Sequence, residues 1–259
     1  MFRLNFTDYP DLGVAGTADQ NNVHYYNTFA TPPMYTNQWP ATYSAAATIP
    51  GVPMTVTETG YFTAPISTDG VDQIAQAIMS EWQIFDFYQN GNISRMYFYE
   101  LIDEACDPGN TNQQYHYGLF DCNNNPKTVA TMIKNLVGLL QDTGASATTF
   151  TPAALDWALV GLPQPNMSNF IPGGFAMLLQ KSNGRFYIPL WYETTVYGWQ
   201  CQCDISVTAA SVNVSFGRPF TTINVYDPIN GSSPINTYSN VSSLTVSLGA
   251  HPLVIEMVP

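Results

Sequence analysis

Two kinds of hydrophobic pattern divide the chain. Up to about residue 141, short apolar runs alternate with longer stretches in which apolar positions recur at helical spacing. Beyond Gly144, short apolar runs are separated by turn residues, and no convincing helical pattern follows. The first pattern predicts parallel strands joined by helices, and the second predicts an antiparallel β-sandwich. We therefore expect a β/α unit at residues 1–145 and a β-sandwich domain at residues 146–259.

Three apolar runs in the first region predict strands, at residues 22–26, 53–58 and 95–100. A helix is expected at residues 71–88, and another after Pro126, because apolar side chains share one face there. On the first helix these are Val71, Ile74, Ala75, Ile78, Trp82 and Phe85, and on the second Val129, Met132, Leu136 and Leu139 or Leu140. Strands and helices in this order predict βα units of a parallel sheet.

The second region contains seven short candidate strands. Their positions are 154–160, 175–180, 185–192, 211–216, 222–226, 244–248 and 253–257. Ser182, Asn183 and Gly184 lie between the second and third of these, so we expect a tight hairpin at that point. Strands of this number and spacing are typical of an antiparallel sandwich.

The composition favours an exported protein. Only 10% of the 259 residues are charged, against about 25% in an average protein. The net charge of −12 and the seven scattered basic residues argue against binding to nucleic acid. No stretch is apolar enough to span a bilayer, and no signal peptide precedes the polar sequence. We expect an extracellular or periplasmic protein whose first residues are missing from this chain.

Four cysteines are the remaining compositional signal. Cys106 and Cys122 bracket a loop rich in Asn, Gln and Gly, which favours a disulfide between them. Cys201 and Cys203 are two residues apart on a predicted strand, so they share one face and are poorly placed to bond each other. The sequence alone does not choose among the three possible pairings. A four-cysteine zinc site is the alternative, but the spacing fits no usual ligand pattern. We expect no metal and no organic cofactor.

Glu58 is the first candidate for chemistry, because it ends the predicted strand at residues 53–58. In a β/α barrel, catalytic groups lie at the C-terminal ends of strands. Retaining glycoside hydrolysis needs two carboxyl groups, roughly 5–5.5 Å apart, as nucleophile and as acid. On position alone, a solvated glutamate at a strand end is the simpler interpretation.

Four short patterns accompany Glu58 in a fixed order. They are His-x-Tyr at 24–26, Glu58 with Thr before it and Gly two residues after it, Tyr-Glu-Leu-x-Asp at 99–103, and Gly-Leu-Phe-Asp at 118–121 followed by Pro126 and Lys127. This series resembles the last three strands of clan A glycoside hydrolase barrels, those related to family 39 and family 5. The segments at 176–193 and 251–256 resemble the β-sandwich that follows such barrels. The resemblance implies the C-terminal half of a (β/α)8 TIM-type barrel followed by an antiparallel β-sandwich.

The resemblance also implies roles for individual residues. Glu58 matches the nucleophile, and His24 and Tyr26 match the pair that lines the sugar subsite beside it. Tyr99, Glu100 and Asp103 fall on a strand-end segment that binds sugar hydroxyls or closes the barrel.

Aromatic residues in loops after the strand ends are further candidates. Trp39, Tyr61 and Tyr115 stand where aromatic rings stack on sugars, although each alone is more often a packing residue.

The acid/base residue has no counterpart in the sequence. In the family it is a Glu that follows Asn at the end of the fourth barrel strand, whereas the first recognisable strand here matches the sixth. None of the six glutamates follows Asn. We expect a retaining hydrolase of a β-linked glycan that takes its acid from a missing N-terminal half or a second chain. The alternative is a non-catalytic module that binds a carbohydrate or a partner subunit.

Overall fold

The computed structural model describes residues 18–27, 47, 49, 51–64, 70–89, 92–166 and 171–259. The chain forms two compact units, Met1–Val129 with Thr195–Ile205, and Ala130–Thr194 with Ser206–Pro259. This division differs from the single break that we expect after residue 145. Most of one helix belongs to the second unit, and the loop Thr195–Ile205 returns to the first.

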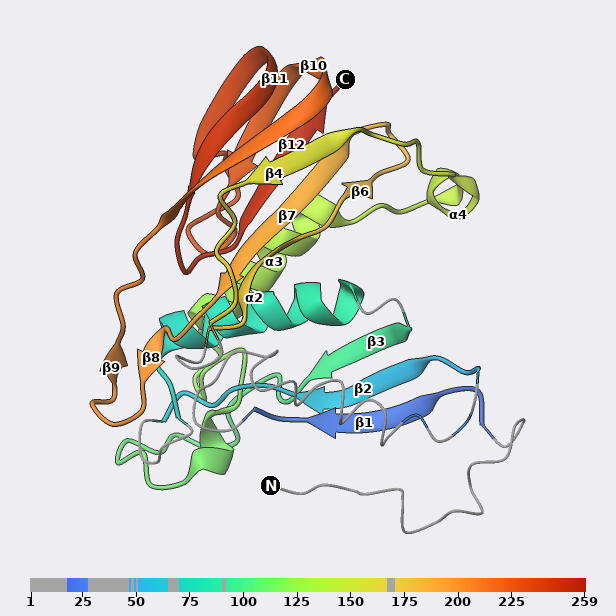
Figure 1. Cartoon of the computed structure of the whole chain (residues 1–259). Coiled ribbons are helices and arrows are strands. Elements are labelled where there is room, and N and C mark those ends of the chain that lie inside the picture. Colours follow the sequence, from blue (N-terminus) through green and yellow to red (C-terminus); the bar gives the residue numbers. More distant parts are fainter. Residues whose placement is uncertain are drawn as a thin grey trace. The chain divides into compact units, whose positions relative to one another are not determined.

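The first unit contains a parallel sheet of three strands, β1 (Asn21–Tyr25), β2 (Met54–Thr59) and β3 (Ile93–Phe98), in the order β1-β2-β3 (Figure 1). Each strand was expected from the sequence, and the parallel pairing confirms that expectation. Helix α2 (Gln73–Gln89) lies between β2 and β3 in the chain, and its Phe87 packs with residues of β1 and β2. The unit is therefore a mixed α/β structure, consistent with part of a barrel.

Helix α2 begins and packs in ways that the sequence shows only in part. Its start is stabilised by Asp72, whose Oδ1 accepts a hydrogen bond of 2.7 Å from the backbone nitrogen of Ala75. Ile74, which falls on the apolar face in the sequence, is 40% exposed, whereas Glu81 and Asp86 are buried. Burial thus extends around the helix instead of following one apolar face.

The second unit is antiparallel. A seven-stranded sheet has the order β11-β10-β12-β7-β5, with β4 paired to β10 and β6 paired to β7. The strands are β4 (Trp157–Val160), β5 (Gly173–Ala176), β6 (Leu179–Gln180), β7 (Phe186–Glu193), β10 (Ala210–Tyr226), β11 (Asn236–Leu248) and β12 (Leu253–Val258). The hairpin expected at Ser182–Gly184 is confirmed, since it joins β6 to β7.

Strand β10 joins two segments that the sequence predicts as separate strands. Its pairing with β11 is irregular between Ser215 and Phe220, and β4 pairs before this irregularity while β12 pairs after it. The apolar core contains Val212 and Val214 from before the irregularity together with Ile223 from after it. Both halves of β10 therefore contribute to one core, and the two-layer sandwich remains a prediction.

The loop at residues 195–205 corrects our interpretation of Cys201 and Cys203. The two residues form a disulfide, with Cα atoms 5.2 Å apart. The prediction was wrong because Cys201 lies in a turn, between the short strands β8 (Tyr197–Gly198) and β9 (Cys203–Asp204). Gln202 has a φ of 51°, so the side chains on either side of it do not follow strand geometry.

Three shorter elements complete the structure. They are the 3₁₀ helix η4 (Gln113–His116) and the α-helices α3 (Thr128–Leu140) and α4 (Ala145–Thr149). Helix α3 was expected after Pro126, whereas α4 lies just beyond Gly144, where we expect no helix. Among the described residues, no helix has the length and apolar character needed to cross a membrane.

Candidate active site

The end of β2 places Glu58 beside two residues of the first strand. Because β1 and β2 run parallel, His24 lies opposite Glu58 in the pairing. The Tyr26 hydroxyl donates a hydrogen bond of 3.1 Å to Glu58 Oε2, and His24 Nδ1 lies 3.2 Å from the same oxygen. The Glu58 side chain remains 38% exposed. The His-x-Tyr pattern and the strand-end glutamate of the sequence therefore meet in space, around a carboxylate that solvent reaches.

Tyr26 remains protonated in this arrangement. Burial raises the pKa of Tyr26, and the negative charge of Glu58 and the hydrogen bond to it raise this pKa further. A phenol with a raised pKa acts as a donor over the whole physiological range. Tyr26 therefore keeps its hydroxyl hydrogen and donates it to Glu58 Oε2, which holds the Glu58 side chain in place.

Tyr117 connects Tyr26 to the end of β3 through ring contacts. Its ring centroid lies 5.6 Å from that of Tyr26 and 5.6 Å from that of Tyr99, with edge-to-face geometry in both pairs. Phe62 packs on the same ring at 5.2 Å. Tyr117 directly precedes the Gly-Leu-Phe-Asp pattern in the sequence, and it is not among the site residues that the sequence predicts. Tyr117 packs between the two predicted strand-end tyrosines, Tyr26 and Tyr99, and no local sequence pattern indicates this packing.

Tyr99 lies in a polar group at the end of β3. Its hydroxyl donates a hydrogen bond of 3.0 Å to Glu104 Oε1 and accepts one of 2.6 Å from Gln114 Nε2. Burial raises the pKa of Tyr99, and the hydrogen bond to Glu104 adds to this effect. Glu104 and Gln114 are further polar residues of this group that the sequence analysis did not single out.

Glu100 is a partly buried carboxyl group whose pKa is raised. Burial raises its pKa, and the charges of Glu104 and Asp103 raise it further. Its Oε1 atom is buried and has no hydrogen-bond partner among the described residues. Glu100 follows β3, so it lies at the same sheet edge as Glu58. No described contact joins the two carboxyl groups.

Asp103, by contrast, is used in a buried ion pair. Its Oδ1 atom accepts hydrogen bonds of 2.7 Å from Lys127 Nζ and of 2.7 Å from the backbone nitrogen of Gly118. Both side chains are almost fully buried, and burial lowers the pKa of Lys127, although Asp103 opposes this effect. A Cβ atom on Gly118 would come within 2.3 Å of the Asp103 nitrogen, so the close approach requires glycine. These contacts favour a structural role for Asp103.

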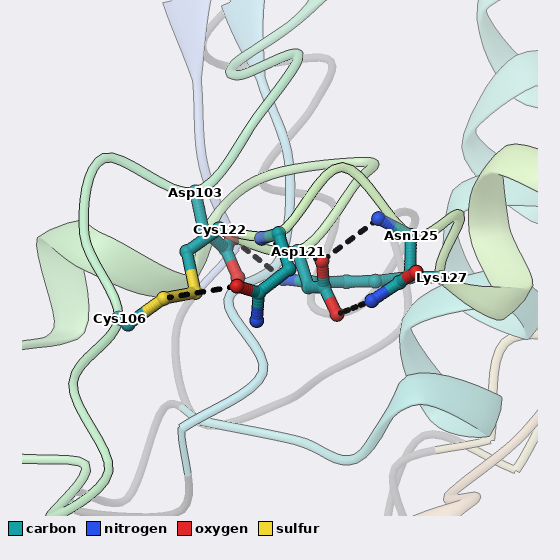
Figure 2. Close-up of a disulfide and its surroundings, with 7 residues drawn as sticks. Asp103, Cys106, Asp121, Cys122, Asn125 and Lys127 are labelled. Carbon is teal, nitrogen blue, oxygen red and sulfur yellow. Dashed lines mark hydrogen bonds and ion pairs between the residues drawn. A yellow bond between two sulfur atoms is a disulfide. The ribbon is translucent and has the colours of Figure 1, made fainter.

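The disulfide predicted between Cys106 and Cys122 is confirmed, with Cα atoms 5.2 Å apart (Figure 2). It closes the loop that carries η4. Asp121, the residue before Cys122, accepts a hydrogen bond of 2.8 Å from the Asn125 backbone nitrogen and one of 2.9 Å from the Asn125 side chain. The segment after β3 is thus held by a covalent bond, a turn and the ion pair at Lys127.

The aromatic candidates in loops have different outcomes. Tyr61 is only 3% exposed, and its hydroxyl accepts a hydrogen bond of 2.7 Å from Asn27, so it is a packing residue in this structure. Trp39 lies outside the described residues. Tyr115 lies within η4 and is half-buried. Among the described residues, no group of three or more His, Cys, Asp or Glu side chains is arranged to hold a metal ion.

Comparison with known proteins gives a fold but no family. No protein-family model and no curated protein sequence matches the chain. A family 39 glycoside hydrolase from the gut symbiont Bacteroides cellulosilyticus WH2 matches 98% of the chain with a TM-score of 0.63 and 12% sequence identity. The match covers 47% of that enzyme, so the chain spans about half of its length.

Other glycan-acting proteins match more weakly. A β-glucuronidase from Bacteroides uniformis has a TM-score of 0.39 at 10% identity, with 94% of this chain and 24% of that protein covered. A β-1,3-glucanosyltransferase from Rhizomucor miehei has a TM-score of 0.34 at 17% identity, over 43% of this chain and 42% of that one. Scores this low support no inference. The match to the family 39 enzyme shows that this chain has a glycoside hydrolase-like fold.

Proposed function

We propose that the chain is part of a retaining glycoside hydrolase for a β-linked glycan, with Glu58 as its nucleophile. The observation that carries the proposal is the position of Glu58, at a strand end and in contact with both Tyr26 and His24. Both described contacts fall on Oε2, so Oε1 is the oxygen that we assign to attack on the anomeric carbon. The glycoside hydrolase-like fold supports the proposal that the chain is part of a glycoside hydrolase.

In the proposed reaction, the Glu58 carboxylate forms an ester bond to the anomeric carbon while the glycosidic bond breaks. The departing oxygen needs a proton, and water later releases the sugar from Glu58. Tyr26 orients the carboxylate by donating its hydroxyl hydrogen to Oε2. His24 lies at the same oxygen and fixes its direction.

The acid/base residue, in this proposal, comes from outside the 259 residues. No glutamate of the chain follows Asn, as the acid/base residue does in the family that the sequence resembles. General acid catalysis contributes typically about 10²–10⁴-fold, so a chain without the acid is slow on unactivated glycans. A 2,4-dinitrophenyl leaving group departs without a proton, so glycosides that carry it require only the nucleophile.

Covalent labelling tests the nucleophile directly. We expect one of a panel of 2,4-dinitrophenyl 2-deoxy-2-fluoro-β-glycosides (gluco, galacto and xylo) to leave a glycosyl adduct on Glu58, detected by peptide mass spectrometry. Glu58→Gln should abolish the adduct, whereas Glu104→Gln should retain it. An adduct on Glu100 or Asp103, or labelling that persists in Glu58→Gln, would show that the nucleophile is another residue.

A binding module without catalysis is the second candidate function. Three large residues in and after β3 favour it, because they are exposed on the surface: Tyr97 (50%), Leu101 (63%) and Ile102 (40%). Aromatic and apolar groups of this kind gather at surfaces that bind partners. Binding of neutral β-glycans without any adduct across the panel would favour this alternative.

A further inference from the structure

The second unit contains a pocket of about 540 Å³ that the proposed reaction does not use. Its walls come from α3, from the β6–β7 hairpin and from strands β10 and β12. Its charged and phenolic lining residues are Lys134, Lys181, Arg185, Tyr187, Tyr226 and Glu256. The volume lies within the range of small-ligand sites, roughly 300–1,000 Å³.

Positive charge is concentrated in this pocket. The whole chain has seven Lys and Arg residues and a net charge of −12. Three of those seven, Lys134, Lys181 and Arg185, line the pocket, where Glu256 is the one acidic residue of the lining. An acidic protein thus places nearly half of its cations around one cavity, which favours an anionic occupant.

The Glu256 carboxylate already accepts four hydrogen bonds, so it does not neutralise all three cations of the pocket. Its Oε1 accepts hydrogen bonds from Arg185 Nη1 at 2.8 Å and from the Tyr187 hydroxyl at 3.0 Å. Its Oε2 accepts hydrogen bonds from Asn224 Nδ2 at 2.9 Å and from the Tyr226 hydroxyl at 2.9 Å. Burial opposes ionisation, but these donors lower the pKa of Glu256. The carboxylate therefore neutralises Arg185, and the lining holds no further acidic residue for the two lysines. Outside the lining, Asp142 is bonded to Ser182 and is close enough to Lys181 for that lysine to lower its pKa, so Lys134 is the less balanced of the two cations.

Each lysine has donors to spare. Lys181 Nζ donates one hydrogen bond of 3.1 Å to the Leu139 carbonyl oxygen and lies 5.3 Å from the centroid of the Tyr187 ring. That uses one of its three N–H groups. Lys134 is exposed on α3, and no hydrogen bond is described for it. The two lysines come from different elements and both line this pocket.

Tyr226 adds a second kind of recognition. Tyr187 and Tyr226 both give their hydroxyl hydrogens to Glu256, but Tyr187 is only 2% exposed, whereas Tyr226 is half-buried. The Tyr226 oxygen can therefore act as an acceptor toward a ligand. Asn135, Asn183 and Ser232 also line the pocket and supply neutral polar groups. A ligand that suits these walls has an anionic group for the lysines and hydroxyl groups for the Tyr226 oxygen and the neutral polar side chains.

We propose that this pocket binds a saccharide that carries an anionic group, with the anion at Lys134 and Lys181 and sugar hydroxyls at Tyr226 and the neutral polar side chains of the lining. The cavity is several times larger than an inorganic anion, and its polar groups are too varied to recognise one alone. The site is independent of Glu58, since all of its lining residues belong to the second unit.

Isothermal titration calorimetry of the full chain with two matched disaccharides tests the proposal. Cellobiouronic acid and cellobiose differ only in a carboxylate that replaces one hydroxymethyl group. We expect the acid to bind at least about tenfold more tightly, as one or two charge-assisted hydrogen bonds would give. The preference should shrink between 50 and 500 mM NaCl, because salt screens exposed charges.

Substitutions locate the binding. Lys134→Gln and Lys181→Gln should each weaken binding of the acid by about three- to tenfold and leave cellobiose unaffected. Arg218→Gln is the matched control, since it removes a cation of the same unit that does not line the pocket. Arg185 is kept, because its loss would leave Glu256 buried without a cation.

Three results would overturn the proposal. Equal affinity for the acid and for cellobiose would show that charge is not recognised. Sulfate that binds as tightly as the acid would show that the saccharide is not recognised. An Arg218→Gln effect as large as that of Lys134→Gln would show that the acid responds to overall charge. Because Glu58 takes no part, none of these results bears on the covalent labelling experiment.

Discussion

Tyr26 and Glu58 are joined by a hydrogen bond of 3.1 Å that links the residue after β1 to the end of β2. The two residues are 32 positions apart, and only the parallel pairing of these strands brings them together. The contact leaves the carboxylate oriented and still open to solvent.

Replacing Tyr26 with Phe should slow the labelling of Glu58 by about tenfold or more. The change removes a donor to a charged oxygen, a bond that contributes roughly 1.5–3 kcal/mol. The rate of adduct formation, followed by intact-protein mass spectrometry, measures the effect. Tyr97→Phe is the control, because the Tyr97 ring is half exposed on β3. Equal rates for the two variants would remove Tyr26 from the site.

Lys127→Met should destabilise the first unit by about 3–5 kcal/mol, since it leaves the buried Asp103 carboxylate without its cation. Denaturation in guanidinium chloride, followed by tryptophan fluorescence, measures the change. Lys134→Met removes an exposed lysine and should change the free energy of unfolding by no more than about 0.5 kcal/mol. Similar midpoints for both variants would contradict the structural role of the ion pair.

The two disulfides should differ in their contribution to stability. The bond between Cys106 and Cys122 spans 16 positions and should stabilise the chain by about 3 kcal/mol through loop closure. The bond between Cys201 and Cys203 closes a far shorter loop, and about 1–2 kcal/mol is expected. Denaturation of each double serine variant separates the two. A larger loss from the second pair would mean that loop closure does not govern these bonds.

Acid should destabilise the second unit through Glu256. Because the folded-state pKa of Glu256 is lowered, its contribution is complete above the unfolded-state pKa of 4.5 and is lost as the pH falls through the lower, folded-state pKa. Glu256→Gln should therefore be less stable than the parent at pH 7, and the gap should narrow below about pH 4.5. The exposed Asp156→Asn serves as the control. Urea denaturation at several pH values gives the curves, and a gap that stays constant with pH would refute this assignment.

The sequence predicts local elements well and misses those set by distant contacts. The strands that end near Tyr26, Glu58 and Tyr99 carry apolar runs, so periodicity finds them. The first half of β11 is mostly polar and exposed, and only its pairing with β10 makes it a strand. Burial of Glu81 on α2 likewise depends on neighbours that the helical pattern does not show.

The candidate site shows the same limit. Ordered motifs point to Glu58, His24 and Tyr26, and the structure brings these three together. Tyr117 and Glu104 lie outside the helices and strands, and Gln114 lies in the single turn of η4, so no hydrophobic periodicity indicates where their side chains point. The place of Tyr61 after a strand predicts a ring that faces the site, but the ring is buried, and its hydroxyl contacts Asn27, which is 34 residues away.

Glu256 also affects how strand β12 aligns with its neighbours when the chain folds. Strand β12 is otherwise apolar, and a run such as Leu253–Val258 could slide along its neighbours with little change in hydrophobic gain. A slipped pairing would bury the carboxylate away from Arg185 and Asn224, at a cost of several kcal/mol. One acidic residue thus sets the register of β12 between β7 and β10, because every shifted pairing is far less stable than this one.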